Sequence, residues 1–327
     1  MKRLFLAALA VAGLSVFGAA SAQEFQAAVV FDMGGKFDKS FNQSAYDGAE
    51  RFKMETGVSY REFEVTSPTQ REQAIRNMAR RGSTIIVGIG FAQAAAIETV
   101  AKEFPDRKFA IIDMVVDLPN VRSVVFREHE GSFLVGMVAA LASKTGKIGF
   151  IGGMDIPLIR NFAAGYVEGA KYVNPDIVVY QNMTGTTPAA WNDPGKGSEL
   201  ALSQFGRGAD VVYAAAGGTG IGVYQAAKDS GNMAIGVDSN QNYLHPGTML
   251  TSMIKRVDVA VFNAFNDARN NEWTSGIVSL GIAENGVGYS IDEHNRSMIT
   301  AEMEARVEQA RQDIISGKIV VQGYQGT

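Results

Sequence analysis

Residues 121–151, VRSVVFREHEGSFLVGMVAALASKTGKIGFI, decide the fold. They open on the β-branched run Val121 to Phe126, continue through a helical pattern over 131–143 and end on the apolar run Lys147 to Ile151. A strand, a helix and a second strand in this order predict parallel strands joined by a right-handed crossover. Because a new helix follows Gly131, we expect the chain to cross between two lobes here.

The same alternation extends outward over the rest of the chain. Short apolar or β-branched runs predict buried strands at 26–31, 84–87, 109–112, 147–151, 177–180, 210–214 and 234–237. Helical patterns lie between them, at 44–56, 69–81, 92–103, 131–143, 159–173, 195–207, 220–230 and 257–270. These units are too many for one sheet of ordinary width, so the sequence predicts an α/β fold with two doubly wound parallel-sheet lobes.

The composition is typical of a folded globular protein. Of 327 residues, 46% are hydrophobic and 20% are charged, and the mean hydropathy is near zero, which excludes disorder, collagen and coiled coil. The net charge is −4 and the chain has no basic tail, so we expect no nucleic-acid partner. The absence of cysteine excludes disulfides, thiolate metal sites and lipid attachment through a cysteine.

The first 22 residues have the form of a secretory signal peptide. A basic start precedes the apolar run Leu4 to Phe17, and Ala20-Ser21-Ala22 resembles a signal-peptidase site. The apolar run has about 14 residues and a membrane-spanning helix needs roughly 20, which disfavours a transmembrane anchor. We therefore expect cleavage after Ala22 and a soluble periplasmic protein that is not a lipoprotein.

Polar residues follow several predicted strands, at the sheet edge where ligands bind in such folds. The first strand is followed by DMGGKFDKSFN at 32–42, a glycine loop with aromatic and hydrogen-bonding groups, and Asp113, Asp238 and Lys255 each follow an apolar run. Each position also has a purely structural interpretation. Ser40 can cap the next helix, Asp113 and Asp238 can cap turns, and Lys255 can be a solvated charge at a strand end.

No pattern in the sequence is typical of catalysis or metal binding. Residues 217–222 read GGTGIG, which lacks the spacing and the acidic residue of a dinucleotide-binding fingerprint. The three histidines are scattered, and neither a nucleophile elbow nor a catalytic triad at strand ends is present. We therefore expect no cofactor, no metal and no enzyme activity.

Three segments carry a resemblance to a known family. They are VFREHEGSFLVG at 125–136, SKTGKIGFIGGM at 143–154, and PLIR at 157–160 with the nearby Phe162, Gly165 and Tyr166. Together with DKSFN at 38–42 and the segment 214–220, they resemble the basic membrane protein family. Members of that family are substrate-binding proteins of ABC transporters, and the best understood of them bind purine nucleosides. The resemblance extends over essentially the whole chain after the signal peptide.

The resemblance implies a type I periplasmic binding protein, with a ligand cleft between two α/β lobes joined by a three-segment hinge. On this basis we expect a signal peptide at 1–22. The N-terminal lobe is expected to comprise 23–127 and 254–284, and the C-terminal lobe 128–253 and 285–327.

The resemblance also implies roles for individual residues in holding a nucleoside. Phe37 and Trp191 correspond to two aromatic rings that clamp the base, although relatives often carry Phe where this chain has Trp191. Asp238 corresponds to a carboxylate that accepts hydrogen bonds from the 2′ and 3′ hydroxyls of ribose. Lys255 corresponds to a cationic partner on the sugar side.

Four further positions complete the predicted site. Asp113 and Asn42, together with Asp32, are expected to address the edges of the base, where an amide can both donate and accept. Gly217 is expected to let the backbone approach the sugar.

These expectations favour a binding protein that delivers a nucleoside or nucleobase to an inner-membrane ABC permease, and that is itself a monomer. Two other functions stay open on the sequence alone. One is a transport component or sensor of the same fold that binds another flat heteroaromatic ring, such as a flavin. The other is an enzyme such as a nucleoside hydrolase, which would release free base from inosine. A repressor of similar fold is excluded by the signal peptide and the missing helix-turn-helix.

Overall fold

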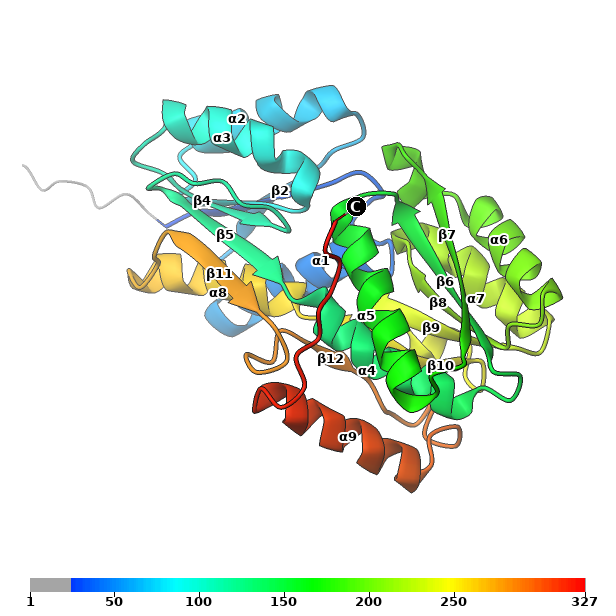
Figure 1. Ribbon diagram of the computed structural model, residues 1–327. Helices are drawn as coiled ribbons and strands as arrows, with labels where there is room; N and C mark the ends of the chain where they lie inside the picture. The colour runs from blue at the N-terminus through cyan, green and yellow to red at the C-terminus, as the bar shows by residue number, and fades with distance from the viewer. Residues whose placement is uncertain (1–24, 327) are drawn as a thin grey trace, which may run out of the picture.

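The computed structural model describes residues 25–326, and the predicted signal peptide lies outside these residues. Within them the chain forms two α/β lobes, each built on a six-stranded sheet (Figure 1). Of the described helices, none is long and apolar enough to cross a membrane.

The first sheet is entirely parallel, with the strand order β11-β5-β4-β3-β1-β2. Its strands are β1 (Ala27–Phe31), β2 (Tyr60–Glu64), β3 (Ile85–Gly88), β4 (Lys108–Ile112), β5 (Val121–Phe126) and β11 (Gly276–Leu280). The helices of this lobe are α1 (Phe41–Thr56), α2 (Arg71–Arg80), α3 (Ala94–Glu103) and α8 (Val257–Asn270).

The second sheet has the order β12-β10-β9-β8-β6-β7, and β12 alone runs antiparallel to its neighbour. Its strands are β6 (Lys147–Met154), β7 (Val178–Gly185), β8 (Val211–Ala215), β9 (Met233–Asp238), β10 (Met249–Lys255) and β12 (Val287–Tyr289). The helices of this lobe are α4 (Glu128–Ala142), α5 (Pro157–Val173), α6 (Pro194–Gly206), α7 (Gly220–Asp229) and α9 (Ala301–Ile315).

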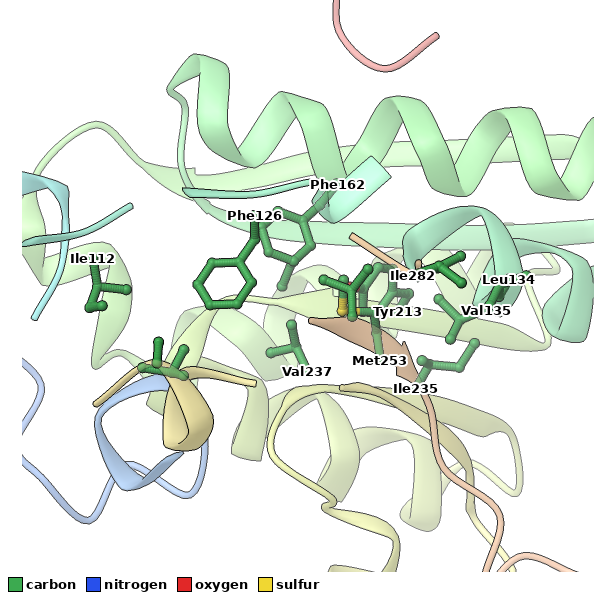
Figure 2. Packing of buried hydrophobic residues seen from close by; sticks show 14 of the residues in the cluster. Ile112, Phe126, Leu134, Val135, Phe162, Tyr213, Ile235, Val237, Met253 and Ile282 are labelled. Atoms are coloured by element: carbon green, nitrogen blue, oxygen red, sulfur yellow. The ribbon is translucent and has the colours of Figure 1, made fainter. Parts of the chain in front are cut away.

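The central strands are buried on both faces, because helices cover both sides of each sheet. Every residue of β1, β3 and β8 is buried, which explains why these runs are continuously apolar instead of alternating. The largest buried cluster extends through both lobes. It includes Ile112 and Phe126 of the first lobe and Phe162 and Val237 of the second, which Figure 2 shows together.

The chain passes between the sheets three times, which gives the expected three-segment hinge. The passages follow β5, β10 and β11. Two backbone hydrogen bonds connect these passages: Arg127 donates to the carbonyl of Leu280 at 2.9 Å, and Arg256 donates to that of Gly286 at 2.8 Å. The three segments are therefore held side by side.

The structure confirms the two-lobed α/β fold and refines its elements. The run 121–126 is a full strand of the first sheet, and the chain crosses to the other lobe directly after it. The sequence patterns did not predict β2, β11, β12 or α9. The predicted strand 177–180 is only the start of β7, which extends to Gly185. β2, β7 and β11 are partly exposed edge strands, and the sequences of β2, β11 and the part of β7 after residue 180 lack the apolar runs by which inner strands are found.

Candidate ligand-binding site

A cavity of about 640 Å³, part of it open to solvent, lies between the two lobes beyond the carboxyl ends of the strands. This is the position where ligands bind in doubly wound sheets. Its walls are mostly apolar or aromatic and carry a few polar groups. The lining residues are Asp32, Met33, Asp38, Phe41, Asn42, Gly90, Phe91, Asp113, Leu158, Ile159, Phe162, Trp191, Ala215, Gly217, Val237, Asp238 and Lys255.

The structure brings most of the predicted site residues to this one cavity. The first lobe contributes Asp32, Asn42 and Asp113, and the second contributes Trp191, Gly217, Asp238 and Lys255. Phe37 is the exception, since it is not among the residues that line the cavity. Side chains from both lobes therefore converge on a single space.

Lys255, at the end of β10, is an almost fully buried cation. Its Nζ lies 2.7 Å from the carboxylate of Asp113 in the other lobe and 3.1 Å from Oε1 of Glu128 at the start of α4. Burial by itself lowers the pKa of Lys255, but the carboxylates of Asp113, Glu128 and Asp238 raise it above its ordinary value. The structure thus excludes the interpretation of Lys255 as a solvated charge, because its side chain is 1% exposed.

Aromatic rings complete the surroundings of this ammonium group. Its Nζ lies 4.9 Å from the ring centre of Phe126, 5.3 Å from that of Phe41 and 5.5 Å from that of Phe162. Such rings attract a cation through their electron-rich faces. Two carboxylates and three rings therefore surround the charged Lys255 side chain, which is almost fully buried.

The contact between Asp113 and Lys255 brings together two residues with different expected roles. The resemblance assigned Asp113 to the base edge and Lys255 to the sugar side of the ligand. The two side chains are 2.7 Å apart, so in this conformation they lie at one point of the cavity wall, and their separate roles stay a prediction. Asp113 is also not a turn cap, because its carboxylate is an ion-pair partner of Lys255.

Asp238 ends β9 in a left-handed backbone conformation, with φ of 64°. Its Oδ2 accepts a 2.6 Å hydrogen bond from the hydroxyl of Ser40, which belongs to the other lobe. Burial raises the pKa of Asp238 to about 7, against the lowering effects of Lys255 and the Ser40 hydrogen bond. The group can therefore exchange a proton near neutral pH.

The loop before α1 joins the two lobes at this point. The hydroxyl of Ser239 donates to the carbonyl of Ser40 at 2.9 Å, and the amide of Gln241 donates to the carbonyl of Lys39 at 2.8 Å. Ser40 was a candidate cap for the helix, but its hydroxyl reaches Asp238 instead.

Asp38 performs the capping function. Its carboxylate accepts hydrogen bonds from the backbone N–H groups of Ser40, Asn42 and Gln43 at 2.8 to 3.0 Å. Burial raises the pKa of Asp38, while these three donors lower it. The first turn of α1 is thereby fixed beside the cavity.

Asp32 and Asn42 form a second fixed group on the first lobe. Arg71 donates to Oδ1 of Asp32 through Nε at 3.1 Å and through Nη2 at 2.8 Å. The Asn42 side chain accepts from the backbone N–H of Asp32 at 3.3 Å and donates to its carbonyl at 3.4 Å. The Asn42 amide is therefore engaged with its own lobe in this conformation.

Trp191 lies on the second lobe, in a short 3-10 turn (Pro188–Trp191), with its ring close against Gly153 of β6. A Cβ on Gly153 would meet Cζ3 of the indole at 2.0 Å, so only glycine permits this approach. The turn is fixed by Thr219, whose hydroxyl donates to the carbonyl of Ala190 at 2.8 Å. Gly217, with φ of 56°, lies beside Trp191. A Cβ at Gly217 would lie 3.4 Å from the backbone carbonyl oxygen of Trp191.

Phe37 does not line the cavity, and the residue is 57% exposed. The loop turns through Gly34 and Gly35, both at positive φ, and the Phe37 ring packs edge-on against Tyr46 with 5.2 Å between centres. Lys36 lies over both rings. In this conformation the rings that face the cavity from the first lobe are Phe41 and Phe91.

Several lining residues were not among the predicted site residues. Phe41 and Asp38 stand in the same loop motif that supplied Phe37 and Asn42, and Phe162 stands in the family segment, so motif membership was their available signal. Phe91 follows the buried strand β3 and could have been found by its place at the strand end. Glu128 also stands in a family segment, 125–136, but nothing in that segment indicates its contact with Lys255, which is distant in the chain.

The chemistry of the cavity favours binding. Lys255, which lines the cavity, and Arg71, which pairs with the lining residue Asp32, are both already paired with carboxylates, and this leaves an apolar space with hydrogen-bonding acceptors. Among the described residues, the three acidic and histidine side chains grouped closely enough to hold a metal are Asp292, Glu293 and His294, which do not line the cavity.

Comparisons with known proteins agree with this architecture. The family described as ABC transporter substrate-binding protein PnrA-like matches residues 25–325. The ABC transporter nucleoside-binding protein BmpA of Lactococcus lactis is 36% identical over 321 residues, which cover 91% of this chain and 89% of that protein. Basic membrane protein A2 of Borrelia garinii is 34% identical over 293 residues, covering 87% of this chain and 84% of that protein.

A solved structure of a solute-binding protein has the same fold. The crystal structure of an ABC transporter system solute-binding protein from Aeropyrum pernix superposes with a TM-score of 0.84 at 32% identity, covering 92% of this chain and 94% of that one. The expectation of no enzyme activity is confirmed, because these proteins are transport components. The chain belongs to the PnrA-like family of ABC transporter substrate-binding proteins, the basic membrane protein family.

Proposed function

We propose that the ligand of this substrate-binding protein is a nucleoside, with a purine nucleoside or its base as the first candidate. The observation that supports the proposal is the placement of Trp191 and Asp238 on the walls of one cavity. The indole offers a face on which a flat base can stack, and stacking contributes roughly 1–3 kcal/mol per base. The carboxylate can accept hydrogen bonds from two vicinal hydroxyls.

The raised pKa of Asp238 supports its assignment to the sugar. Among residues 25–326, the hydrogen-bond partner of the buried Asp238 carboxylate is Ser40, and the carboxylate can exchange that hydrogen bond for those of a ribose diol. The hydroxyls would then stabilise the ionised form, so ligand binding is expected to release a proton below pH 7. No such release is expected from a ligand without vicinal hydroxyls.

The two lobes are expected to close on the ligand. Each supplies part of the wall, with Asn42 and Asp113 on one side and Trp191 and Asp238 on the other. Hinge closure around a ligand is the usual motion of such binding proteins. Phe37 would join the clamp only if its glycine-containing loop moved toward the cavity, so its assigned role stays a prediction.

We further propose that the chain is exported to the periplasm as a monomer, released from its signal peptide after Ala22, and that it delivers its ligand to an inner-membrane ABC permease. The leader pattern and the family membership support this. Intact mass of the exported protein tests the first part. A species that begins at Gln23 supports it, and one that retains residues 1–22 contradicts it.

A thermal-shift panel tests the ligand assignment. The panel contains inosine, adenosine, guanosine, uridine, hypoxanthine and riboflavin. A ligand at 100 times its dissociation constant adds about 2.7 kcal/mol to the free energy of unfolding. Stabilisation by purine nucleosides supports the proposal, whereas stabilisation by riboflavin alone, or by no compound of the panel, contradicts it. Free base released during incubation with inosine would reopen the hydrolase alternative.

A further inference from the structure

The C-terminal segment after α9 runs back along the second lobe and ends beside α5 (Figure 1). Val321 is buried in the main hydrophobic cluster. The backbone N–H of Gln322 donates to Oε2 of Glu168 at 3.0 Å, and the ring of Tyr324 lies 5.8 Å from the guanidinium of Arg160. We call residues 321–324 the C-terminal strap.

The strap contacts Asn161, a partly buried residue in the first half of α5. The backbone N–H of Tyr324 donates to Oδ1 of Asn161 at 3.1 Å. The amide Nδ2 of Asn161 donates to Oε2 of Glu128 at 3.2 Å and lies 3.1 Å from Nδ1 of His129. The side chain of Asn161 is therefore engaged at both its oxygen and its nitrogen.

These partners admit only one orientation of the Asn161 amide. A backbone N–H can only donate, so the atom that faces Tyr324 must be the oxygen. An ionised carboxylate can only accept, so the atom that faces Glu128 must be the NH2 group. Burial lowers the pKa of His129, so its ring is neutral and its Nδ1 can accept the second amide hydrogen.

Glu128 connects Asn161 to the ligand cavity. One carboxylate oxygen accepts from Asn161, and the other lies 3.1 Å from Nζ of Lys255, which lines the cavity. Burial raises the pKa of Glu128, so each donor that Glu128 receives helps to keep it ionised beside Lys255. The charged groups around it are Lys255 of β10 and Asp113 at the end of β4, and the nearby His129 is neutral.

The strap fits closely against Asn161. Gly323 has φ of 63°, and a Cβ at this position would lie 2.5 Å from Oδ1 of Asn161 and 3.1 Å from Cγ of His129. Gly326, with φ of 78°, has nothing within 4 Å of its built Cβ. The two glycines share a backbone conformation, and only Gly323 is constrained by its neighbours.

We propose that the C-terminal strap and Asn161 form a positioning element for the ligand cavity. The strap fixes the amide of Asn161, Asn161 holds Glu128, and Glu128 holds Lys255. Asn161 and Gly323 are positioning residues, since neither is among the residues that line the cavity. The consequence for ligand affinity rests on the proposed nucleoside-binding function, but the effect on Lys255 does not.

The first experiment needs no ligand. The ¹⁵Nζ signal of the Lys255 ammonium group in the purified protein is assigned as the signal that Lys255→Met removes. The Gly323→Ala and Asn161→Leu substitutions are expected to shift or broaden this signal. Gly326→Ala is the matched control and is expected to leave it unchanged, because both alanine substitutions carry the same backbone strain and only one displaces Asn161.

The second experiment measures inosine affinity by calorimetry. Gly323→Ala and Asn161→Leu are each expected to weaken binding by about five- to tenfold, below the full effect of losing a charged hydrogen bond because Lys255 keeps Asp113. In a Glu128→Gln background, Gly323→Ala is expected to change inosine affinity by less than about twofold, because the contact of residue 128 with Lys255 is already altered. A general loss of stability would not produce this dependence on Glu128.

The outcomes separate the two proposals. An unchanged Lys255 signal in folded Gly323→Ala and Asn161→Leu proteins overturns the positioning element, whatever the ligand is. A changed signal with no inosine binding by the parent protein supports the positioning element and contradicts the nucleoside assignment. Additive effects of Gly323→Ala and Glu128→Gln on inosine affinity would show that the strap does not act through Glu128.

Discussion

Each lobe has an aspartate at the carboxyl end of an equivalent strand of its sheet. Each sheet arranges its first five strands in the same order, so β4 and β9 occupy equivalent positions. Asp113 follows β4 with φ of 69°, and Asp238 ends β9 with φ of 64°. A left-handed residue at this point turns the chain away from the sheet and leaves the side chain at its carboxyl edge.

The two aspartates nevertheless have different chemical surroundings. Asp113 forms an ion pair with Lys255 at 2.7 Å, whereas Asp238 accepts one hydrogen bond from Ser40 and has its pKa raised by burial to about 7. The same backbone conformation thus supplies a carboxylate paired with a cation in one lobe and a carboxylate that accepts a hydrogen bond from a hydroxyl in the other. We therefore expect the partner, and not the position, to decide what each aspartate does.

The largest expected effect comes from removing the cation of the Asp113 pair. Lys255→Met leaves Asp113 and Glu128 buried with no counter-charge. Breaking a buried ion pair in this way costs about 3–5 kcal/mol. We expect a loss of this size in the free energy of unfolding at pH 7, measured by urea denaturation.

The control is Lys102→Met, which removes an exposed ion pair to Glu98 at 2.6 Å. Exposed pairs contribute between zero and about 1 kcal/mol, so this variant is expected to keep its stability. Equal losses in the two variants would contradict the structural role of the Asp113 pair.

Asp238→Asn is expected to raise the free energy of unfolding, in contrast to Lys255→Met, because it removes a poorly paired buried acid. The pKa of Asp238 is raised from its ordinary value to about 7 in the folded protein, so its contribution to stability is complete below about pH 4 and is lost as the pH rises through 7. Above pH 7 the variant should therefore be more stable than the parent by up to about 4 kcal/mol, with little difference near pH 4.

Urea denaturation at pH 4.5 and at pH 8 measures this difference. Ser40 can still donate to the amide oxygen of the variant, so its hydrogen bond is retained. A difference that does not change with pH would show that Asp238 is not a buried acid with a raised pKa.

Trp191→Ala tests the aromatic side of the second lobe. Loss of stacking should weaken nucleoside binding by about 1–3 kcal/mol. The only other tryptophan, Trp273, lies outside the cavity beside Arg122, so ligand-induced changes in emission should disappear with Trp191. A titration of the variant that matches that of the parent would exclude Trp191 from the clamp.

The smallest effect is expected from Phe37→Ala. The ring is exposed and packs on Tyr46, so stacking on a base requires its loop to move, and the cost of that movement reduces the gain. We expect nucleoside binding to weaken by ~0.5–1 kcal/mol, less than for Trp191→Ala. A loss as large as that of Trp191→Ala would show that the loop closes fully over the ligand.

The sequence predicted the parts of the fold that local patterns determine. Buried strands such as β1 and β8 carry continuous apolar runs, and the polar residues after them marked the cavity edge. Edge strands such as β2 carry no such run, because one side of each edge strand meets solvent. Their existence depends on neighbours that are distant in the chain.

The sequence predicted seven of the residues that line the cavity, but it did not predict how their side chains pair. Asp113 and Lys255 are 142 positions apart and Ser40 and Asp238 are 198 apart, so no local pattern could join them. The position of Phe37 depends on the turn at Gly34 and Gly35, whose direction the motif does not encode. Glu128 was not predicted because it does not line the cavity and is connected to it through its contact with Lys255.

We propose that Asp238 recognises the two hydroxyls of a ribose. Calorimetry of the parent protein with inosine and with 2′,3′-dideoxyinosine tests it directly. Each charge-assisted hydrogen bond contributes roughly 1.5–3 kcal/mol, and water partly replaces the two hydroxyls when they are missing, so inosine should bind more tightly by about 2–4 kcal/mol, or about 30- to 1000-fold. Asp238→Ala should remove most of this difference, and binding of hypoxanthine should change far less. Equal affinity of the parent protein for inosine and its dideoxy analogue would contradict the claim, since no diol would then be recognised.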